Sequence, residues 1–344
     1  MIIHLKETVN TELAAQLAKQ AQAQYFIREG QTILITSSSN KELPDFLREY
    51  TAEHFAMASD IQLASRTYQP ATREVTINPG TSPAVATVEQ AVKIGGSTNN
   101  TLMITGPCSI ESWEQIVTCA DMLKELGITT LRAGCFKPRT SPYSFQGLGM
   151  EGLKMLAQIR EEYGFNIITE VRDATHVEAV IEHADIVQIG AKAMYDHGIL
   201  RTCGEARKPV LLKRHFGATL QELVQAAEFV LSGGNEQVML CERGIRTFET
   251  KTRFTLDLCG VSYLKEHINL PIILDTSHAM GYAYGVPDLT RACVAMGVDG
   301  LLIESHPNPK VAKSDAAQQL NLDEFRSLYR SVQSVAEAVG RKVV

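Results

Sequence analysis

The strongest constraint on the fold is an alternation of short apolar segments with longer amphipathic ones, repeated eight times beyond about residue 100. This alternation is typical of a parallel sheet built from βα units. Eight units over roughly 240 residues match a closed α/β (β/α)8 TIM barrel, with an open doubly wound sheet as the alternative. The expected strands are Leu102–Thr105, Thr130–Ala133, Ile167–Thr169, Ile186–Ile189, Val210–Leu212, Val238–Leu240, Ile272–Leu274 and Gly300–Ile303. The expected helices include Ser112–Leu126, Glu151–Tyr163, His176–His183, Leu220–Leu231, Pro287–Met296 and Leu322–Val339.

The first 68 residues have a different order, in which strand, helix, strand, strand, helix and strand follow one another. The expected segments are Met1–Leu5, Glu12–Ala23, Gln24–Arg28, Gln31–Thr36, Leu43–Ala56 and Ile61–Tyr68. This order favours a small ferredoxin-like α+β module. A stretch rich in Pro, Thr, Gly and Ser follows. We therefore predict a ferredoxin-like domain over 1–68, a linker over 69–84 and the barrel over 85–344.

Composition argues against several classes of partner. The formal net charge is −6, which opposes general attraction to nucleic acid or to an anionic membrane. The seven cysteines are scattered without a Cys-x-x-Cys pair, which favours a reducing compartment over a disulfide framework. The N-terminus lacks the features of a signal peptide, and no apolar run approaches the ~18 residues of a membrane span. We expect a cytoplasmic protein that binds neither nucleic acid nor membrane.

Potential metal ligands follow three of the expected strands. Cys108 follows the first strand, His278 follows the seventh, and Glu304 follows the eighth, with Asp315 further along the last loop. Strands seven, eight and one are neighbours in a closed barrel, and barrel enzymes place active sites at the C-terminal ends of strands. A lone cysteine there is more often a small buried hydrophobe. Four such residues at neighbouring strand ends indicate a divalent transition metal such as Mn²⁺, Fe²⁺, Co²⁺ or Zn²⁺.

Basic residues follow most of the remaining strands. They are Arg132, Lys137, Arg139, Lys192, Lys213, Arg214, Arg243 and Arg246. So many like charges at one barrel mouth would be destabilising without bound anions, which predicts phosphate or carboxylate ligands. Pairing with carboxylates such as Glu170 or Glu242 would account for only one or two of them. Gly-rich nucleotide-binding motifs are absent from the sequence.

The motifs around these residues resemble 3-deoxy-D-arabino-heptulosonate 7-phosphate (DAHP) synthase. They are Gly106-Pro107-Cys108-Ser109-Ile110-Glu111, Lys137-Pro138-Arg139-Thr140-Ser141-Pro142-Tyr143-Ser144-Phe145-Gln146-Gly147, Leu211-Leu212-Lys213-Arg214, Cys241-Glu242-Arg243-Gly244, Asp275-Thr276-Ser277-His278 and Glu304-Ser305-His306-Pro307. The resemblance runs from about residue 100 to the end. The N-terminal module resembles the ferredoxin-like extension of the type Iβ subclass.

This resemblance implies a transferase that condenses phosphoenolpyruvate with D-erythrose 4-phosphate and water, the first step of the shikimate pathway to aromatic amino acids. Its implied metal ligands are Cys108, His278, Glu304 and Asp315, with Mn²⁺ as the first expectation. Its implied phosphoenolpyruvate contacts are Arg132, Lys137, Glu170, Gly190, Ala191, Lys192, Lys213 and Arg243. Its implied erythrose 4-phosphate contacts are Lys137, Pro138, Arg139 and Thr140, with Asp315 nearby. We expect Lys137 to donate a proton to the new alkoxide, and Cys108, His278 and Asp315 to act with the metal.

The sequence departs from the family pattern at two positions. Lys192 stands where the family usually has arginine, so a point charge replaces a planar bidentate group. His215 stands where a glycine is expected. The subclass implies inhibition by tyrosine or phenylalanine through the N-terminal module, and a homotetramer.

Two alternatives remain open. One is 3-deoxy-D-manno-octulosonate 8-phosphate synthase, which carries Lys-Ala-Asn-Arg where this chain has Lys137-Pro138-Arg139-Thr140. The other is an amino-acid-sensing protein on an inactive barrel.

Overall fold

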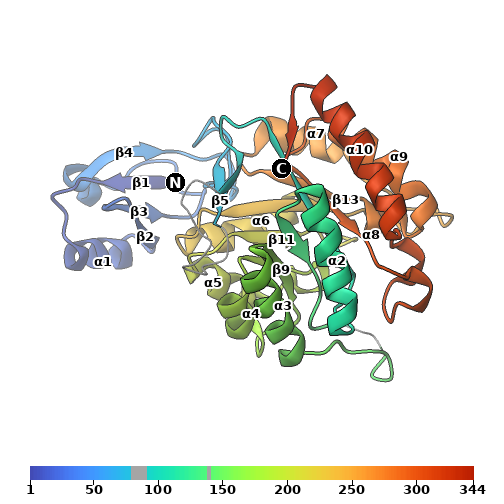
Figure 1. The fold of residues 1–344 in the computed structure, drawn as a ribbon. Helices are drawn as coiled ribbons and strands as arrows, with labels where there is room; N and C mark the ends of the chain where they lie inside the picture. The colour runs from blue at the N-terminus through green and yellow to red at the C-terminus, as the bar shows by residue number, and fades with distance from the viewer. Residues whose placement is uncertain (79–90, 138–140) are drawn as a thin grey trace.

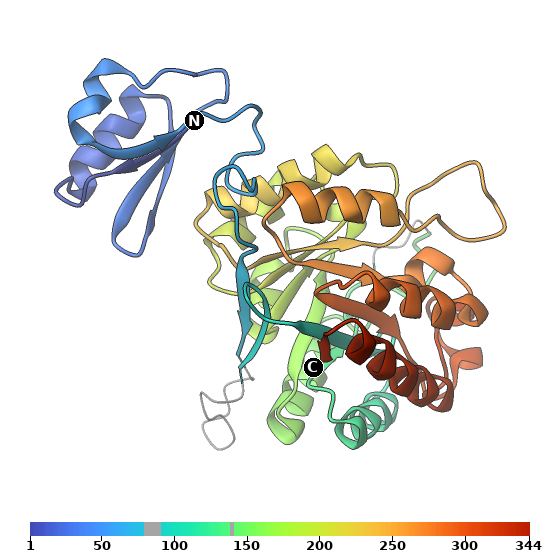
Figure 2. The ribbon, with the colours of Figure 1, turned by 90° about the horizontal axis from the view of Figure 1, so that it is seen from above.

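The computed structural model describes residues 1–78, 91–137 and 141–344, and it has two parts. A small antiparallel sheet with one α-helix lies beside a larger barrel, as two perpendicular views show (Figures 1 and 2). The small part contains β1 (Ile2–Leu5), α1 (Thr11–Gln20), β2 (Gln24–Arg28), β3 (Gln31–Ile35), the 3₁₀ helix η1 (Asp45–Tyr50) and β4 (Thr51–Phe55). Its sheet has the order β2-β3-β1-β4, and every pairing in it is antiparallel.

The second half of this small part differs from the prediction. The segment Leu43–Ala56 is not one helix, because it contains the single 3₁₀ helix η1 and then the strand β4. The segment Ile61–Tyr68 contains turns and one isolated bridge at Ser65 instead of a strand. Strand β4 pairs only with β1, and its three central residues are exposed, so it carries no apolar alternation. Pairing at the sheet edge therefore overrides the helical pattern of the sequence.

The barrel contains all eight predicted strands, each within two residues of its expected ends. They are β7 (Asn100–Gly106), β8 (Thr130–Arg132), β9 (Asn166–Val171), β10 (Ile186–Ile189), β11 (Val210–Lys213), β12 (Val238–Glu242), β13 (Ile272–Asp275) and β14 (Gly300–Glu304). Neighbouring strands are parallel, and β14 pairs with β7 from Gly300 opposite Leu102 to Glu304 opposite Gly106. This last pairing closes the sheet, so the open alternative is wrong.

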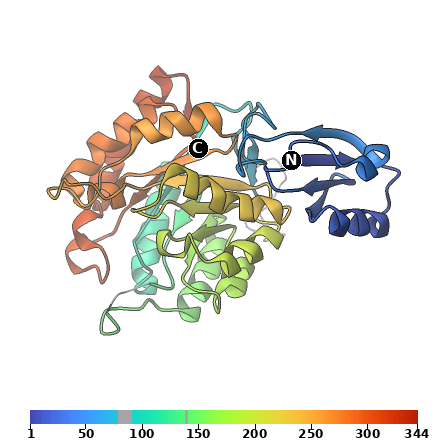
Figure 3. The ribbon, with the colours of Figure 1, turned by 180° about the vertical axis from the view of Figure 1, so that it is seen from behind.

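Helices surround the strands on the outside (Figure 3). They are α2 (Trp113–Leu126), α3 (Met150–Tyr163), α4 (Val177–His183), α5 (His197–Glu205), α6 (Leu220–Ser232), α7 (Leu258–His267), α8 (Thr276–Met280), α9 (Val286–Ala295) and α10 (Leu322–Ala338). Local signals set several ends. Helix α2 begins after Ser112, whose side chain accepts a hydrogen bond from the Gln115 amide, and ends at Gly127 with φ of 69°. Within the described residues, no helix has both the length and the apolar character needed to cross a membrane.

A hairpin that was not predicted lies between the two parts. It consists of β5 (Glu74–Ile77) and β6 (Val92–Gly95), and its apolar side chains belong to the same buried cluster as residues inside the barrel. Because β6 leads directly into the start of β7, the hairpin covers the end of the barrel where the strands begin. Strand β5 falls within the expected linker 69–84, of which residues 79–84 lie outside the described residues. The candidate site lies at the opposite end of the barrel, where the strands finish.

Candidate active site

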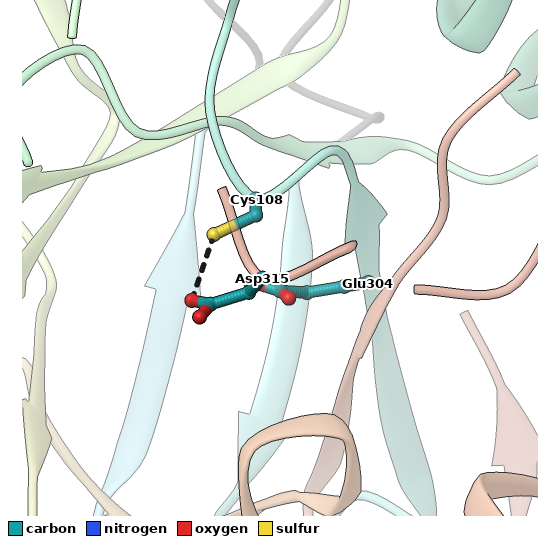
Figure 4. A group of neighbouring side chains, drawn as sticks. All are labelled: Cys108, Glu304 and Asp315. Carbon is teal, nitrogen blue, oxygen red and sulfur yellow. Dashed lines mark hydrogen bonds between the residues drawn. The ribbon is translucent and has the colours of Figure 1, made fainter. Parts of the chain in front are cut away.

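Three of the predicted metal ligands meet at the ends of β7 and β14. Ligand atoms of Cys108, Glu304 and Asp315 all lie within 4.8 Å of one another (Figure 4). The Cys108 thiol donates a hydrogen bond of 3.2 Å to Asp315 Oδ2. Asp315 has a φ of 46° in the left-handed region, which aspartate tolerates better than most residues. The convergence expected from strands eight and one is therefore present.

His278 brings an imidazole to the same place from the first residues of α8. Its Nε2 lies 3.6 Å from Glu304 Oε1 and 3.9 Å from Asp315 Oδ2. Asp275, the residue before α8, accepts a hydrogen bond of 3.0 Å from the His278 amide and places Oδ2 at 2.8 Å from Nδ1. This contact turns Nε2 toward the carboxylates. The His278 imidazole thus lies beside two of the other three predicted ligands.

The protonation of these groups follows from burial and nearby charge. Burial, followed by the charge of Glu304, raises the pKa of the Cys108 thiol to about 12. Burial opposes ionisation of Glu304 and Asp315, but nearby cationic groups outweigh it and lower the pKa of both carboxyls. Among these groups His278 has the largest effect on the pKa of the two carboxyls, yet burial lowers the pKa of His278 itself. At neutral pH the two carboxylates are therefore stabilised chiefly by Arg132 and Arg253.

The donor set fits a divalent transition metal. It offers one sulfur, one imidazole nitrogen and two carboxylates in a buried space, which is the mixture that borderline metal ions prefer. Metal ions bind the thiolate form, so loading this site would release the Cys108 proton. The site therefore suits such a metal ion because its donor atoms are of the right chemical types and lie close to one another.

Several residues that sequence reasoning missed orient these donors. Gln318 donates a hydrogen bond of 2.7 Å to Glu304 Oε2, and Arg253 donates one of 2.7 Å to Gln318 Oε1. The side-chain oxygen of Gln319 accepts a hydrogen bond of 2.9 Å from the Cys108 amide. Asp275 could have been recognised from its place three residues before His278. The two glutamines follow Asp315 closely in the last loop, and Arg253 lies between β12 and α7, but none of the three belongs to a motif quoted above.

At least three of the predicted cations in the described part of the barrel mouth have carboxylate partners, more than the one or two expected. Arg132 donates to Glu304 Oε1 at 2.7 Å, and Lys213 Nζ lies 2.5 Å from Asp275 Oδ2. The third, Arg214, contacts Glu242 at 2.8 Å and Asp257 at 2.9 Å. Arg214 therefore has a structural role in holding the β11 and β12 ends together.

Lys137 and Arg243 have no carboxylate within ion-pair distance in the part of the chain that the structure describes. Lys137 Nζ lies 3.1 Å from Cys108 Sγ and 3.2 Å from the Cys108 carbonyl oxygen. Burial disfavours its ammonium, but the electrostatic interactions with Cys108 and Glu170 outweigh this and raise the pKa of Lys137. The side chain is thus a buried ammonium beside the candidate metal site.

The remaining predicted contacts lie around the end of β10. The Glu170 carboxylate accepts a hydrogen bond of 2.6 Å from Gln188 and lies against Gly190, where an added Cβ would be 2.3 Å from Glu170 Oε1. Ala191 and Lys192 belong to the 3₁₀ helix η3 (Ala191–Ala193), and Lys192 is exposed. Pro138, Arg139 and Thr140 lie outside the described residues.

His215, which departs from the family pattern, lies between the cations and an exposed tyrosine. Its Nδ1 accepts a hydrogen bond of 3.1 Å from the Gly217 amide, so a neutral ring carries its proton on Nε2. Burial, followed by the charges of Arg243 and Arg246, lowers the pKa of His215. Tyr195 packs edge-on against the ring at 5.7 Å. His215 is therefore a neutral ring that packs against Tyr195 and lies near Arg243 and Arg246.

Comparison with known proteins agrees with this geometry. The sequence profile of the DAHP synthetase I family matches residues 83–341. A phospho-2-dehydro-3-deoxyheptonate aldolase of Thermotoga maritima is 44% identical over 241 residues, which cover 70% of this chain and 71% of that protein. A 2-dehydro-3-deoxyphosphooctonate aldolase of Stenotrophomonas maltophilia is 31% identical over 258 residues, covering 70% of this chain and 92% of that protein.

Solved structures extend the likeness to the N-terminal part. The crystal structure of the DAHP synthase of Thermotoga maritima matches with a TM-score of 0.77 and 35% identity over 100% of this chain and 99% of that one. A truncated form of the synthase from the same organism matches with a TM-score of 0.73 and 38% identity, covering 82% of this chain and 98% of that chain. The chain therefore belongs to the DAHP synthetase I family.

Proposed function

We propose that this protein is a DAHP synthase, which joins phosphoenolpyruvate to D-erythrose 4-phosphate with water and releases inorganic phosphate. The observation that carries the proposal is the convergence of Cys108, His278, Glu304 and Asp315 beside the buried cation Lys137, with Arg243 buried after β12 at the same end of the barrel. A metal-ligand set next to unneutralised positive charge suits a reaction between two phosphorylated substrates.

Sequence identity and the match to the N-terminal module favour this activity over the octulosonate reaction. The heptonate aldolase of Thermotoga maritima is 44% identical and the octulosonate relative from Stenotrophomonas maltophilia 31% identical, and each of these matches covers 70% of this chain. The heptulosonate synthase structure from Thermotoga maritima matches the whole chain, the N-terminal module included. The segment Lys137-Pro138-Arg139-Thr140 also carries the heptulosonate pattern in sequence.

Each substrate has a proposed set of contacts. Phosphoenolpyruvate would be held by Arg132, Lys137, Glu170, Gly190, Ala191, Lys192, Lys213 and Arg243. Erythrose 4-phosphate would be held by Lys137, Pro138, Arg139 and Thr140, with Asp315 nearby. Fixed cations bring the two anionic substrates together, which supplies proximity and stabilises charge that develops during the reaction.

The proposed chemistry assigns separate roles to the ion and to the side chains. Cys108, His278, Glu304 and Asp315 would hold a divalent ion, Mn²⁺ first among Fe²⁺, Co²⁺ and Zn²⁺, and that ion when bound would polarise the aldehyde oxygen. Carbon C3 of phosphoenolpyruvate bonds to the aldehyde carbon, and Lys137 gives its proton to the new alkoxide. Water then adds at C2, and phosphate leaves with cleavage of its C–O bond. The raised pKa of Lys137 keeps the proton available at neutral pH.

The N-terminal module suggests regulation. We propose that residues 1–68 bind tyrosine or phenylalanine and inhibit the barrel, and that the protein works in the cytoplasm as a homotetramer. Removing residues 1–68 should leave turnover in place and abolish inhibition. Inhibition that persists in the shortened protein would contradict this role.

One assay tests the main proposal. Phosphate release is measured with phosphoenolpyruvate and either erythrose 4-phosphate or arabinose 5-phosphate, before and after chelation, with single metals added back. Turnover with erythrose 4-phosphate that is lost on chelation and restored by a divalent metal is expected. Turnover with arabinose 5-phosphate alone would favour the octulosonate reaction, and no turnover would favour an amino-acid sensor.

A further inference from the structure

Arg243 is held differently from the other buried cations at the barrel mouth. Arg132, Lys213 and Arg214 each contact a carboxylate, whereas no ion pair joins Arg243 to any acidic residue that the structure describes. Its side chain is buried, and its Nε has no hydrogen-bond partner. A buried N–H group without a hydrogen-bond partner destabilises the folded protein, so the contacts that hold the Arg243 side chain must come from groups other than a carboxylate.

The group that contacts the guanidinium of Arg243 is the ring of Phe254. Arg243 Cζ lies 4.5 Å from the centroid of this ring, within the range of a cation–π interaction. Phe254 in turn stacks on Phe216, with centroids 5.4 Å apart and an interplanar angle of 19°. Arg246 Cζ lies 4.5 Å from the centroid of Phe216. Arg253 Cζ also lies 5.7 Å from the centroid of Phe254. Three guanidinium groups and two rings therefore form one contiguous cluster, in which Arg243 makes the shorter of the two contacts with Phe254.

The backbone holds Phe254 firmly against Arg243. Its amide donates a hydrogen bond of 2.9 Å to the Ala279 carbonyl, in the helix that also carries His278. The next residue, Thr255, exchanges two hydrogen bonds of 2.9 Å with Ile245. Gly244 makes this approach possible, since a Cβ there would lie 2.6 Å from the Phe254 Cβ, and its φ of 96° is a glycine conformation.

We propose that Phe254 is a positioning residue of the anion site, which holds Arg243 by the face of its ring and leaves the N–H groups of the guanidinium for a phosphate oxygen. A carboxylate in the same place would orient Arg243 too, but it would compete with an incoming phosphate. An aromatic face attracts the cation without accepting those hydrogen bonds. Burial lowers the pKa of Arg243, so an arriving anion also relieves an unfavourable charge. The proposal rests on the proposed function only for the identity of the anion, phosphoenolpyruvate.

The test compares three variants of the full-length protein. Phe254→Leu removes the ring, Phe254→Tyr keeps it, and Phe248→Leu changes a ring in the same loop that is 98% exposed. Binding of inorganic phosphate and of phosphoenolpyruvate is measured by calorimetry, and kcat and both KM values by steady-state kinetics. If Phe254→Leu shows no native thermal transition, Phe254→Met replaces it as a ringless variant of similar volume.

We expect the ringless variant to bind inorganic phosphate and phosphoenolpyruvate about ten-fold more weakly, which corresponds to about 1.4 kcal/mol. The KM for phosphoenolpyruvate rises to a similar extent, while kcat and the KM for erythrose 4-phosphate stay within about two-fold. Phe254→Tyr and Phe248→Leu match the parent protein. Unchanged phosphate binding, or a fall in kcat with both KM values shifted together, would overturn the proposal. A parent protein that binds phosphate but makes no DAHP would refute the proposed function, and the phosphate comparison would still decide the role of Phe254.

Discussion

Glu228, on α6, allows a direct test of how the N-terminal part is attached to the barrel. Its carboxylate accepts backbone hydrogen bonds from Gln62 at 2.7 Å, Leu63 at 3.2 Å and Ala64 at 2.8 Å. Burial raises the pKa of this carboxyl to about 7, although the three amide donors and the charge of Arg73 act in the opposite direction. The connection between the two parts thus contains a carboxyl group that titrates near neutral pH.

The sign of the effect on stability follows from this shift. A carboxyl whose pKa is higher in the folded protein binds more protons there than in the unfolded chain. Its contribution to stability is greatest below pH 4.5 and is lost as the pH rises toward about 7. The full shift would be worth about 3 kcal/mol. Because the side chain also lines a cavity of about 380 Å³ that it shares with Asp60 and Gln62, hydration reduces our expected value to about 1–2 kcal/mol.

The assay compares the pH dependence of unfolding in three proteins. The free energy of unfolding is measured in urea at pH 5 and pH 8 for the parent protein, for Glu228→Gln and for Glu266→Gln, which changes an exposed residue of α7. We expect the parent and the Glu266 variant to lose about 1–2 kcal/mol more than the Glu228 variant between these two values. Equal losses in all three would refute the reasoning. Stability of the parent that rises with pH relative to Glu228→Gln would show that the amide donors outweigh burial.

Three further predictions concern the candidate site. Gly190→Ala places a Cβ 2.3 Å from Glu170 Oε1, so we expect the KM for phosphoenolpyruvate to rise about ten-fold in steady-state kinetics, and an unchanged KM would contradict this. Gln318→Leu removes the hydrogen bond to Glu304 Oε2, so the Kd for Mn²⁺ should rise about 10–100-fold by calorimetry, and parental affinity would argue against an orienting role. Cys108→Ala removes the sulfur ligand, so turnover should fall at least about 100-fold and should not return on metal add-back, whereas recovery would show that sulfur is dispensable.

The barrel could be predicted from sequence because its strands are buried on both faces. Such strands are continuous apolar runs, as in Ile186–Ile189, where all four residues are buried. The grouping of the candidate metal ligands could be predicted for a related reason. Once eight parallel strands close, Cys108, His278 and Glu304 lie at neighbouring strand ends whatever their separation in sequence.

The parts that escaped prediction lack such a pattern. Strand β4 lies at a sheet edge with its central residues exposed, so its sequence from Thr51 to Phe55 shows no alternation. Strands β5 and β6 are four residues each, and their apolar side chains are buried by contact with barrel residues distant in sequence. In both cases the strand is specified by what it pairs with or packs against, and a local reading of the sequence does not contain that information.

The sequence also presented the metal ligands and the cations as two separate groups, and the structure joins them. Glu304 faces the candidate metal site and also accepts a hydrogen bond from Arg132. Asp275 lies 2.8 Å from the His278 ring and also pairs with Lys213. Each of these carboxylates compensates a buried cation and also orients or supplies a candidate metal ligand, so changing either carboxylate would leave a buried cation unpaired. Arg243 stands outside this network and packs against the ring of Phe254, whereas Lys137, which also has no carboxylate partner among the described residues, contacts Cys108.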